Sequence, residues 1–177
     1  MNFYARRFNL YLPALLALML AGGCSTFKKD KSEPLGTIHI HVQSSANLPD
    51  QIKTVSVVRA SPVLLTISPQ PFLSEANLLA ARLIEAEGGF AIQLKFDETG
   101  GWMLEQTLAA NPGKHLVIFG QWGDTPDDAR WLAAPIITGR IANGILTFTP
   151  DMSHDEAQQF VDRLNNSAKK FQTDSSK

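Results

Sequence analysis

Four histidines are the first side chains to consider as chemical groups, because imidazole binds metal ions and transfers protons near neutral pH. His39 and His41 alternate within the segment TIHIHV, residues 37–42, and therefore share one side of a strand. A zinc site needs three or four converging ligands, and only His115 and His154 remain elsewhere. We interpret the pair as solvent-facing polar positions, and we predict neither a metal site nor a cofactor.

Patterns typical of nucleophilic catalysis are absent from the sequence, which contains no Gly-x-Ser-x-Gly elbow and no P-loop. The adjacent acids Asp97 and Glu98 precede an expected helix, where carboxylates stabilise the helix dipole. We therefore predict no catalytic residue and a protein that is not an enzyme. A metal-dependent or hydrolytic enzyme is the alternative.

The segment GQWGDTPDDARW, residues 120–131, combines acids with aromatic side chains: Trp122, Asp124, Asp127, Asp128 and Trp131. In a partner-binding loop, the aromatic rings would supply contact area and the acids would steer the partner. The oxygen spacing of an EF-hand loop is absent, so calcium is not expected. The alternative, which we favour, is a solvated, turn-rich loop with one tryptophan folded back onto the core.

Trp102 and Met103 are a second candidate contact surface. They lie off the face that Gly101, Leu104 and Leu108 share in the expected helix. If they are exposed, they form an apolar patch of the kind that binds partners. If the helix is rotated from this interpretation, they belong to the core, and the sequence leaves both possibilities open.

Cys24 is the only cysteine, and it follows an apolar run in LMLAGGCST, residues 18–26. A disulfide needs a second cysteine, and an exposed free thiol is a liability in an oxidising compartment. Arg6 and Arg7 precede the apolar run, which is too short to span a membrane and has the length of a signal-peptide core.

The stretch around Cys24 resembles the lipobox of bacterial lipoproteins, in which the cysteine sulfur is acylated and the chain is cut before it. The resemblance implies a signal peptide over residues 1–23, lipidation of Cys24 and membrane attachment through N-terminal acyl chains. Ser25 resembles the outer-membrane sorting class in a host with two membranes, with the domain facing the periplasm. The alternatives are a secretory signal with an accidental cysteine, or an anchor left uncleaved.

Charge and size limit the function classes. The formal net charge is −1 over 177 residues, and the expected leader removes two arginines. A nucleic-acid-binding protein normally carries a basic surplus, so we expect no nucleic-acid partner. The hydrophobic share of 44% is sufficient for a buried core, and the length suits one domain.

Hydrophobic periodicity predicts the elements that position these residues. Strands are expected at residues 37–42, 54–60, 62–68, 90–96 and 115–120, with a Gly88-Gly89 hairpin turn. The segment 135–148 predicts a hairpin around Asn143-Gly144, because a type I′ turn needs positive φ at both positions. Helices are expected at residues 98–111 and 153–165, the second beginning with a Ser153–Glu156 capping box.

These elements predict an α+β domain over residues 36–166, mainly an antiparallel sheet with two principal helices packed on it. Residues 24–35 read as a flexible linker beside the lipid, and residues 167–177 as a disordered tail. Residues 74–89 are helical by propensity but precede a clear strand, so the residues alone do not decide their structure.

Residues 55–166 resemble the head subdomain of the first periplasmic region of the SecD protein-export subunit. The likeness lies in FLSEANLLAARLIEAEGGFAIQLKFDETGG, NPGKHLVIFG, AAPIITGRIANGILTF and SHDEAQQFVDRL, in that order. It implies a short helical turn from Ser74 to about Ala80 and a strand from Ala81 to Glu87. The loop 120–131 is longer than the family's turn.

The resemblance implies a fold and contact with polypeptides, but not translocase activity, because a fold does not carry its function with it. We expect no spanning helix after cleavage. Our first hypothesis is a non-enzymatic protein-binding lipoprotein linked to protein export or envelope assembly. Its candidate surfaces are the 120–131 loop, Trp102 with Met103, and an open sheet edge. A structural subunit of a membrane complex is a further alternative.

Overall fold

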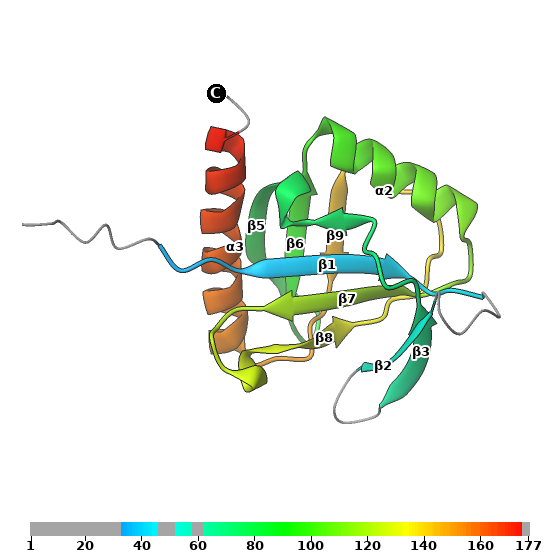
Figure 1. Ribbon diagram of the computed structural model, residues 1–177, viewed down its shortest axis with the longest axis horizontal. Coiled ribbons are helices and arrows are strands. Elements are labelled where there is room, and N and C mark those ends of the chain that lie inside the picture. Colours follow the sequence, from blue (N-terminus) through cyan, green and yellow to red (C-terminus); the bar gives the residue numbers. More distant parts are fainter. Residues whose placement is uncertain (1–32, 46–51, 58–61, 175–177) are drawn as a thin grey trace, which may run out of the picture. The chain divides into compact units, whose positions relative to one another are not determined.

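Two antiparallel sheets enclose a shared core in the computed structural model, which describes residues 33–45, 52–57 and 62–174 (Figure 1). The strands are β1 Thr37–Val42, β2 Lys53–Val57, β3 Val63–Ile67, β4 Leu73–Ser74, β5 Leu78–Ala86, β6 Gly89–Phe96, β7 Leu116–Gln121, β8 Ala129–Ala133 and β9 Ile145–Phe148. The helices are α2 Glu98–Ala110 and α3 His154–Asp174, with two short 3-10 turns, η2 Glu75–Asn77 and η3 Pro126–Asp128. The predicted signal peptide, Cys24 and most of the predicted linker lie outside the described residues.

The first sheet has the order β4-β1-β7-β8, and the second has the order β5-β6-β9. Strands β2 and β3 form a separate two-stranded ribbon. Every strand pair is antiparallel, as in β1 and β7, where His39 lies opposite Phe119 and Ile40 opposite Ile118. The predicted α+β class, mainly antiparallel with two principal helices, is confirmed.

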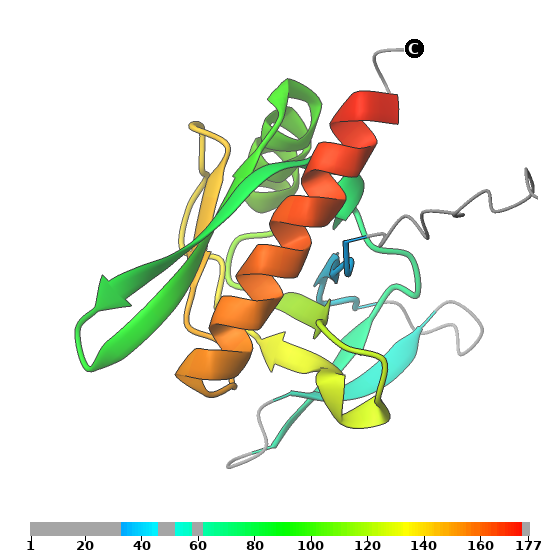
Figure 2. The ribbon, with the colours of Figure 1, turned by 90° about the vertical axis from the view of Figure 1, so that its left-hand side faces the viewer.

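Alternating side chains place the core between the two sheets and the helices. Ile38 and Ile40 of β1 are fully buried, as their predicted shared face requires. The buried stripe on α3 comprises Ala157, Phe160, Val161 and Leu164, as the helical periodicity predicts. Figure 2 shows α3 lying alongside the long β5–β6 hairpin, and both contribute to this core.

The last helix is longer than predicted. We expected it to end at Asn165, with a disordered tail from residue 167, but α3 continues to Asp174. The reason is tertiary: the buried Ser167 hydroxyl donates to the Gly36 carbonyl at 2.7 Å and accepts from the Gly36 N–H at 3.1 Å. Ala168 is also buried. Contacts with Gly36, at the start of the domain, therefore stabilise the last turns of α3, whose own sequence does not predict a helix.

The predicted hairpin over residues 135–148 is wrong in its first arm. Pro135 and Ile137 bond instead to the start of β7 and the residues just before it, through Leu116 N–H to Pro135 O at 2.9 Å and Ile137 N–H to Lys114 O at 2.8 Å. Gly144 has the positive φ that the turn signal predicted, and β9 then pairs with β6. Asn143-Gly144 therefore precedes β9, a strand of the second sheet, and does not connect two paired arms of a hairpin.

The segment 74–89 resolves nearly as the SecD likeness implies. A single 3-10 turn, η2, is followed by β5, which begins at Leu78 rather than Ala81. The β5–β6 turn has φ of +80° at Gly88 and +157° at Gly89, which favours glycine at both positions. The exposed hairpin tip extends beyond the core (Figure 2).

Candidate protein-binding surface

Trp122, proposed as a possible contact residue, is a core residue. Its side chain is 2% exposed and meets the Phe160 ring edge-on, with 6.0 Å between centroids. The Arg130 guanidinium lies over the same ring, 4.7 Å from its centre. The favoured interpretation, one tryptophan folded back onto the core, describes this residue.

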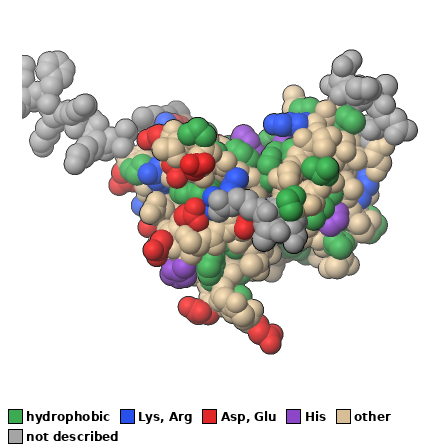
Figure 3. Space-filling model, turned by 90° about the horizontal axis from the view of Figure 1, so that it is seen from below, with side chains coloured by type: hydrophobic (Ala, Val, Ile, Leu, Met, Phe, Trp, Pro, Cys, Tyr) green, Lys and Arg blue, Asp and Glu red, His purple; other side chains and the backbone are tan. Residues whose placement is uncertain are grey.

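The loop predicted over residues 120–131 is shorter in the structure, because its two ends pair as strands β7 and β8, and Asp128 shapes the turn between them. Its carboxylate accepts hydrogen bonds from the Thr125 hydroxyl at 2.6 Å and from the Thr125 N–H at 3.2 Å, and its carbonyl accepts from Trp122 N–H. Asp124 and Asp127 are exposed. In the view from below, carboxylates gather on the left, over η3 and the start of α3 (Figure 3). A steering role for these acids remains a prediction.

Arg130 connects this loop to α3. It donates to Glu156 at 2.9 Å and to the Asp151 carbonyl at 3.0 Å. Burial acts to raise the pKa of Glu156, but hydrogen bonds from Ser153 and Arg130 outweigh it and hold the pKa below its usual value. The Ser153 hydroxyl accepts from Glu156 N–H, and the Glu156 carboxylate accepts from Ser153 N–H, which confirms the predicted capping box.

The two histidines of β1 face a second, smaller core rather than open solvent. The β2–β3 ribbon buries Val57 and Ile67 with Val117 of β7 on this side of the first sheet. His41 is only 4% exposed, so its predicted solvent-facing position is wrong, because the sequence pattern does not show that the ribbon covers this face.

Aromatic rings surround His41. Trp131, half-buried, lies 5.4 Å from it, and Phe119 lies 5.3 Å from Trp131. Nδ1 of His41 lies 2.9 Å from the Ser68 carbonyl, to which it donates as N–H. Burial lowers the pKa of His41 and outweighs the hydrogen bond to Ser68, which raises it; the nearby His39 lowers the pKa further. Within the described residues, no group of three or more His, Cys, Asp or Glu side chains could hold a metal ion.

The two candidate contact residues on α2, Trp102 and Met103, differ in exposure. Trp102 is 64% exposed, whereas Met103 packs half-buried against the main core. The buried face of α2 consists of Gly100, Leu104 and Leu108, so the predicted member Gly101 is wrong. Gly100 packs closely against Asn77, where an added Cβ would lie only 2.9 Å from the Asn77 side chain. Trp102 therefore remains a candidate contact residue, standing away from the core.

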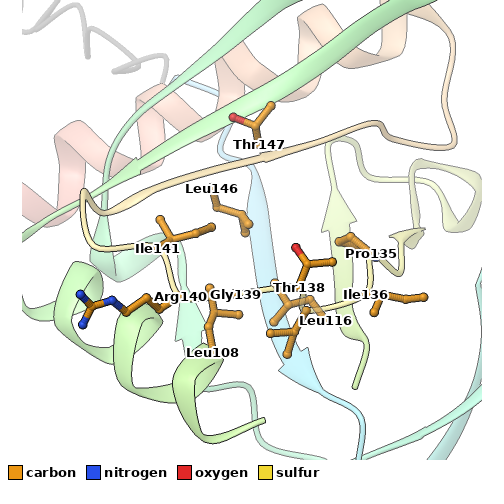
Figure 4. A pocket seen from close by; sticks show the side chains of 11 residues that line it. Leu108, Leu116, Pro135, Ile136, Thr138, Gly139, Arg140, Ile141, Leu146 and Thr147 are labelled. Atoms are coloured by element: carbon orange, nitrogen blue, oxygen red, sulfur yellow. The ribbon is translucent and has the colours of Figure 1, made fainter. Parts of the chain in front are cut away.

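A cavity of about 260 Å³ lies between α2, β9 and the segment that follows β8 (Figure 4). Leu108, Leu116, Ile137 and Leu146 form its apolar floor. Ile136, at its margin, is 58% exposed. The sequence pattern does not predict this cavity, because residues 135–142 resemble a hairpin arm. The available signal was an isoleucine, Ile136, shortly before a turn-rich run of glycine, arginine and asparagine.

Arg140 lies at the margin of the same cavity, and its guanidinium points away from the apolar floor (Figure 4). It is 3.4 Å from Glu105 of α2, and its side chain is 71% exposed. The pocket therefore joins an apolar interior to a margin that carries an Arg140–Glu105 ion pair. Such a pocket can hold an apolar side chain.

No protein-family model matches the chain, and no curated protein is similar to it at a significant level. A solved structure of SecDF, described as a membrane component that enhances protein export, aligns with a TM-score of 0.53 at 18% identity. The match covers 75% of this chain and 63% of that one. The chain thus has a SecD-like fold and spans less than two thirds of that SecDF chain.

Two further SecDF structures also align with the chain. One is in a super-membrane-facing form, with a TM-score of 0.47 and 15% identity over 89% of this chain and 33% of that chain. The other is a translocon-associated membrane protein from Thermus thermophilus, with a TM-score of 0.40 and 14% identity over 90% of this chain and 34% of that chain. Neither of the helices in the described residues has the length and hydropathy needed to cross a bilayer.

Proposed function

We propose that this chain is an envelope lipoprotein, tethered to a membrane through acylated Cys24, whose SecD-like domain is a non-enzymatic protein-binding module. The module serves protein export or envelope assembly and faces the periplasm, from the outer membrane in a host that has two membranes. The anchor and the domain have separate support, and each is tested separately.

Support for the anchor comes from the leader. Two arginines, an apolar run of signal-peptide length and small residues precede the lone Cys24. A single acyl chain binds membranes only marginally, so stable attachment needs more than one. Mass measurement of the amino-terminal fragment, taken from the full-length protein extracted from membranes, tests this half. A fragment that begins at Cys24 and carries fatty acyl mass is expected; an unmodified thiol, or a chain that begins at Met1, would contradict it.

One structural observation carries the protein-binding half: an apolar cavity lies beside the edge of β9 that no described strand pairs with. Free strand edges and apolar cavities are the features with which domains hold extended polypeptides. The link to export rests on the fold shared with SecDF, whose description names export.

The binding half is tested by chemical cross-linking in intact cells that express the tagged full-length chain. We expect a recurrent adduct with an envelope protein in the wild type, and a weaker adduct in Cys24→Ser, because the soluble form is no longer concentrated at the membrane. If the tagged chain were expressed at its normal level but recovered only without a cross-linked partner, the proposal would be contradicted.

A further inference from the structure

Strand β9 presents one unpaired edge of the second sheet. Among the strands of the described residues, β6 is its only neighbour. Phe96 N–H donates to Gly144 O at 2.9 Å, and Leu94 lies opposite Leu146, so these positions direct their main-chain groups toward β6. Because the direction alternates along an antiparallel strand, the main-chain groups of Ile145 and Thr147 point the other way.

Of the four outward main-chain groups of Ile145 and Thr147, one has a hydrogen-bond partner within the described residues. Ile145 N–H donates to the Asn143 side chain at 3.1 Å. The Ile145 carbonyl and both main-chain groups of Thr147 are left for a partner strand, and Thr147 is exposed. An added strand could therefore make its hydrogen bonds to Ile145 and Thr147.

The cavity lies along this edge. Leu146 and Thr147 point to opposite sides of β9 in Figure 4, and both line the cavity. The far wall is the segment from Pro135 to Ile137, which pairs with the start of β7 and the two residues before it and extends the edge of the first sheet. A strand added to β9 would direct every second side chain, on the Leu146 face, into the apolar interior.

Charge distinguishes the two faces of such a strand. The opposite face of β9 joins a smaller hollow lined by Arg82, Lys95 and Ile145, and Lys95 lies opposite Ile145 in the register. On the cavity side, Arg140 is paired with the Glu105 carboxylate, so this side has no net positive charge. The positive charge beside the β9 edge therefore lies on the outer face, at Arg82 and Lys95.

We propose that the free edge of β9 binds an extended segment of a partner polypeptide as an added strand, with apolar side chains in the cavity and acidic side chains on the outer face. The occupant is thus a segment in which apolar and acidic residues alternate. This inference rests on the proposed function and specifies the chemistry of its partner.

The test uses the full-length chain in detergent and a short fluorescent peptide of alternating valine and glutamate, with binding followed by anisotropy. A peptide with lysine in place of glutamate tests the charge, and one N-methylated at alternate backbone positions tests the strand pairing. We expect the glutamate peptide to bind, and each altered peptide to bind with an affinity at least about tenfold lower. If the N-methylated peptide bound as tightly as the unmethylated glutamate peptide, strand addition would be overturned. This comparison needs no variant of the protein.

Two variants at one position locate the site. Thr147→Pro removes the outward N–H without removing a ladder bond to β6, and edge strands tolerate proline. Thr147→Val keeps the N–H and the β-branched shape. We expect the proline variant to lose at least about tenfold in affinity and the valine variant to bind like the wild type. Equal affinities for the two variants would place the peptide elsewhere and overturn the inference.

Lys95→Glu tests the positive charge of the outer face, where Lys95 lies opposite Ile145. It should weaken binding of the glutamate peptide and strengthen binding of the lysine peptide, which reverses the preference. An unchanged preference would contradict the acidic assignment. Binding of a fluorescent fatty acid in the cavity, with no binding of any peptide, would overturn the inference as well. Envelope adducts in intact cells together with no peptide binding would overturn this site alone and leave the proposed function standing.

Discussion

The side-chain amide of Asn165 on α3 forms two hydrogen bonds with the main chain of Ala81 on β5. Its Oδ1 accepts from Ala81 N–H at 2.8 Å, and its Nδ2 donates to the Ala81 carbonyl at 3.0 Å. The amide thus takes the place of a neighbouring strand at the outer edge of β5. Further along α3, Gln172 donates to the Leu79 carbonyl. The helix therefore closes one edge of the second sheet, whereas β9 leaves the other edge open.

Asn165→Ala should lower the free energy of unfolding by about 2 kcal/mol, because both polar groups of Ala81 lose their partner at a part-buried position. Asn166→Ala is the matched control. The Asn166 amide makes an exposed bond to the Pro34 carbonyl, and its loss should cost less than about 0.5 kcal/mol. Urea unfolding of the two variants measures the difference, and equal midpoints would refute the edge-closing role.

Trp122→Ala should destabilise the domain by about 3–5 kcal/mol, because it leaves a cavity against Phe160 and removes the ring beneath Arg130. Trp102→Ala, at an exposed position, should change stability by less than about 0.5 kcal/mol. Thermal and urea unfolding test both variants. A stable Trp122→Ala protein would show that the loop does not depend on this buried ring.

Stability should fall as the pH drops below about 6.5, the ordinary pKa of histidine, because burial lowers the pKa of His41 in the folded state. Between the folded and unfolded pKa values, the unfolded chain binds more protons, so the stabilising contribution is complete above that range and is lost as the pH falls through it. Nδ1–H can keep its bond to Ser68, and the cost comes from burying a charge near His39 and Lys53.

The dependence of the urea midpoint on pH, compared between the wild type and His41→Phe, measures this contribution. The variant should show a smaller loss of stability on acidification. His154→Gln is the control, because the His154 side chain is 61% exposed. If His41→Phe retained the full wild-type slope, the acid sensitivity would have to come from other groups.

Local signals in the sequence predicted much of the fold. The alternation of Ile38 and Ile40 placed β1 in the core, the Ser153–Glu156 box marked the start of α3, and Gly88-Gly89 marked the β5–β6 turn. Each of these depends on residues close together in the chain, so periodicity and capping chemistry are sufficient to identify it.

The largest failures involve partners distant in the sequence. The end of α3 is held by Gly36, which lies 131 positions from Ser167. Burial of His41 requires the ribbon, and the hairpin fails because Pro135 pairs with the start of β7 rather than with β9. An open sheet edge was predicted as a candidate surface, but its location at β9 follows only from the strand order. Tertiary pairing of this kind leaves no local pattern in the sequence.

The central claim is that the tethered domain binds protein at the β9 side of the molecule. The most direct measurement is the yield of protein adducts in intact cells from a photoreactive side chain placed at Ile136, beside the cavity, compared with one placed at Leu64 on β3. Both positions are exposed, at 58% and 72%, so access to solvent does not separate them. We predict discrete protein adducts from position 136 and few from position 64. Adducts from position 64 alone, or from neither position, would contradict the account.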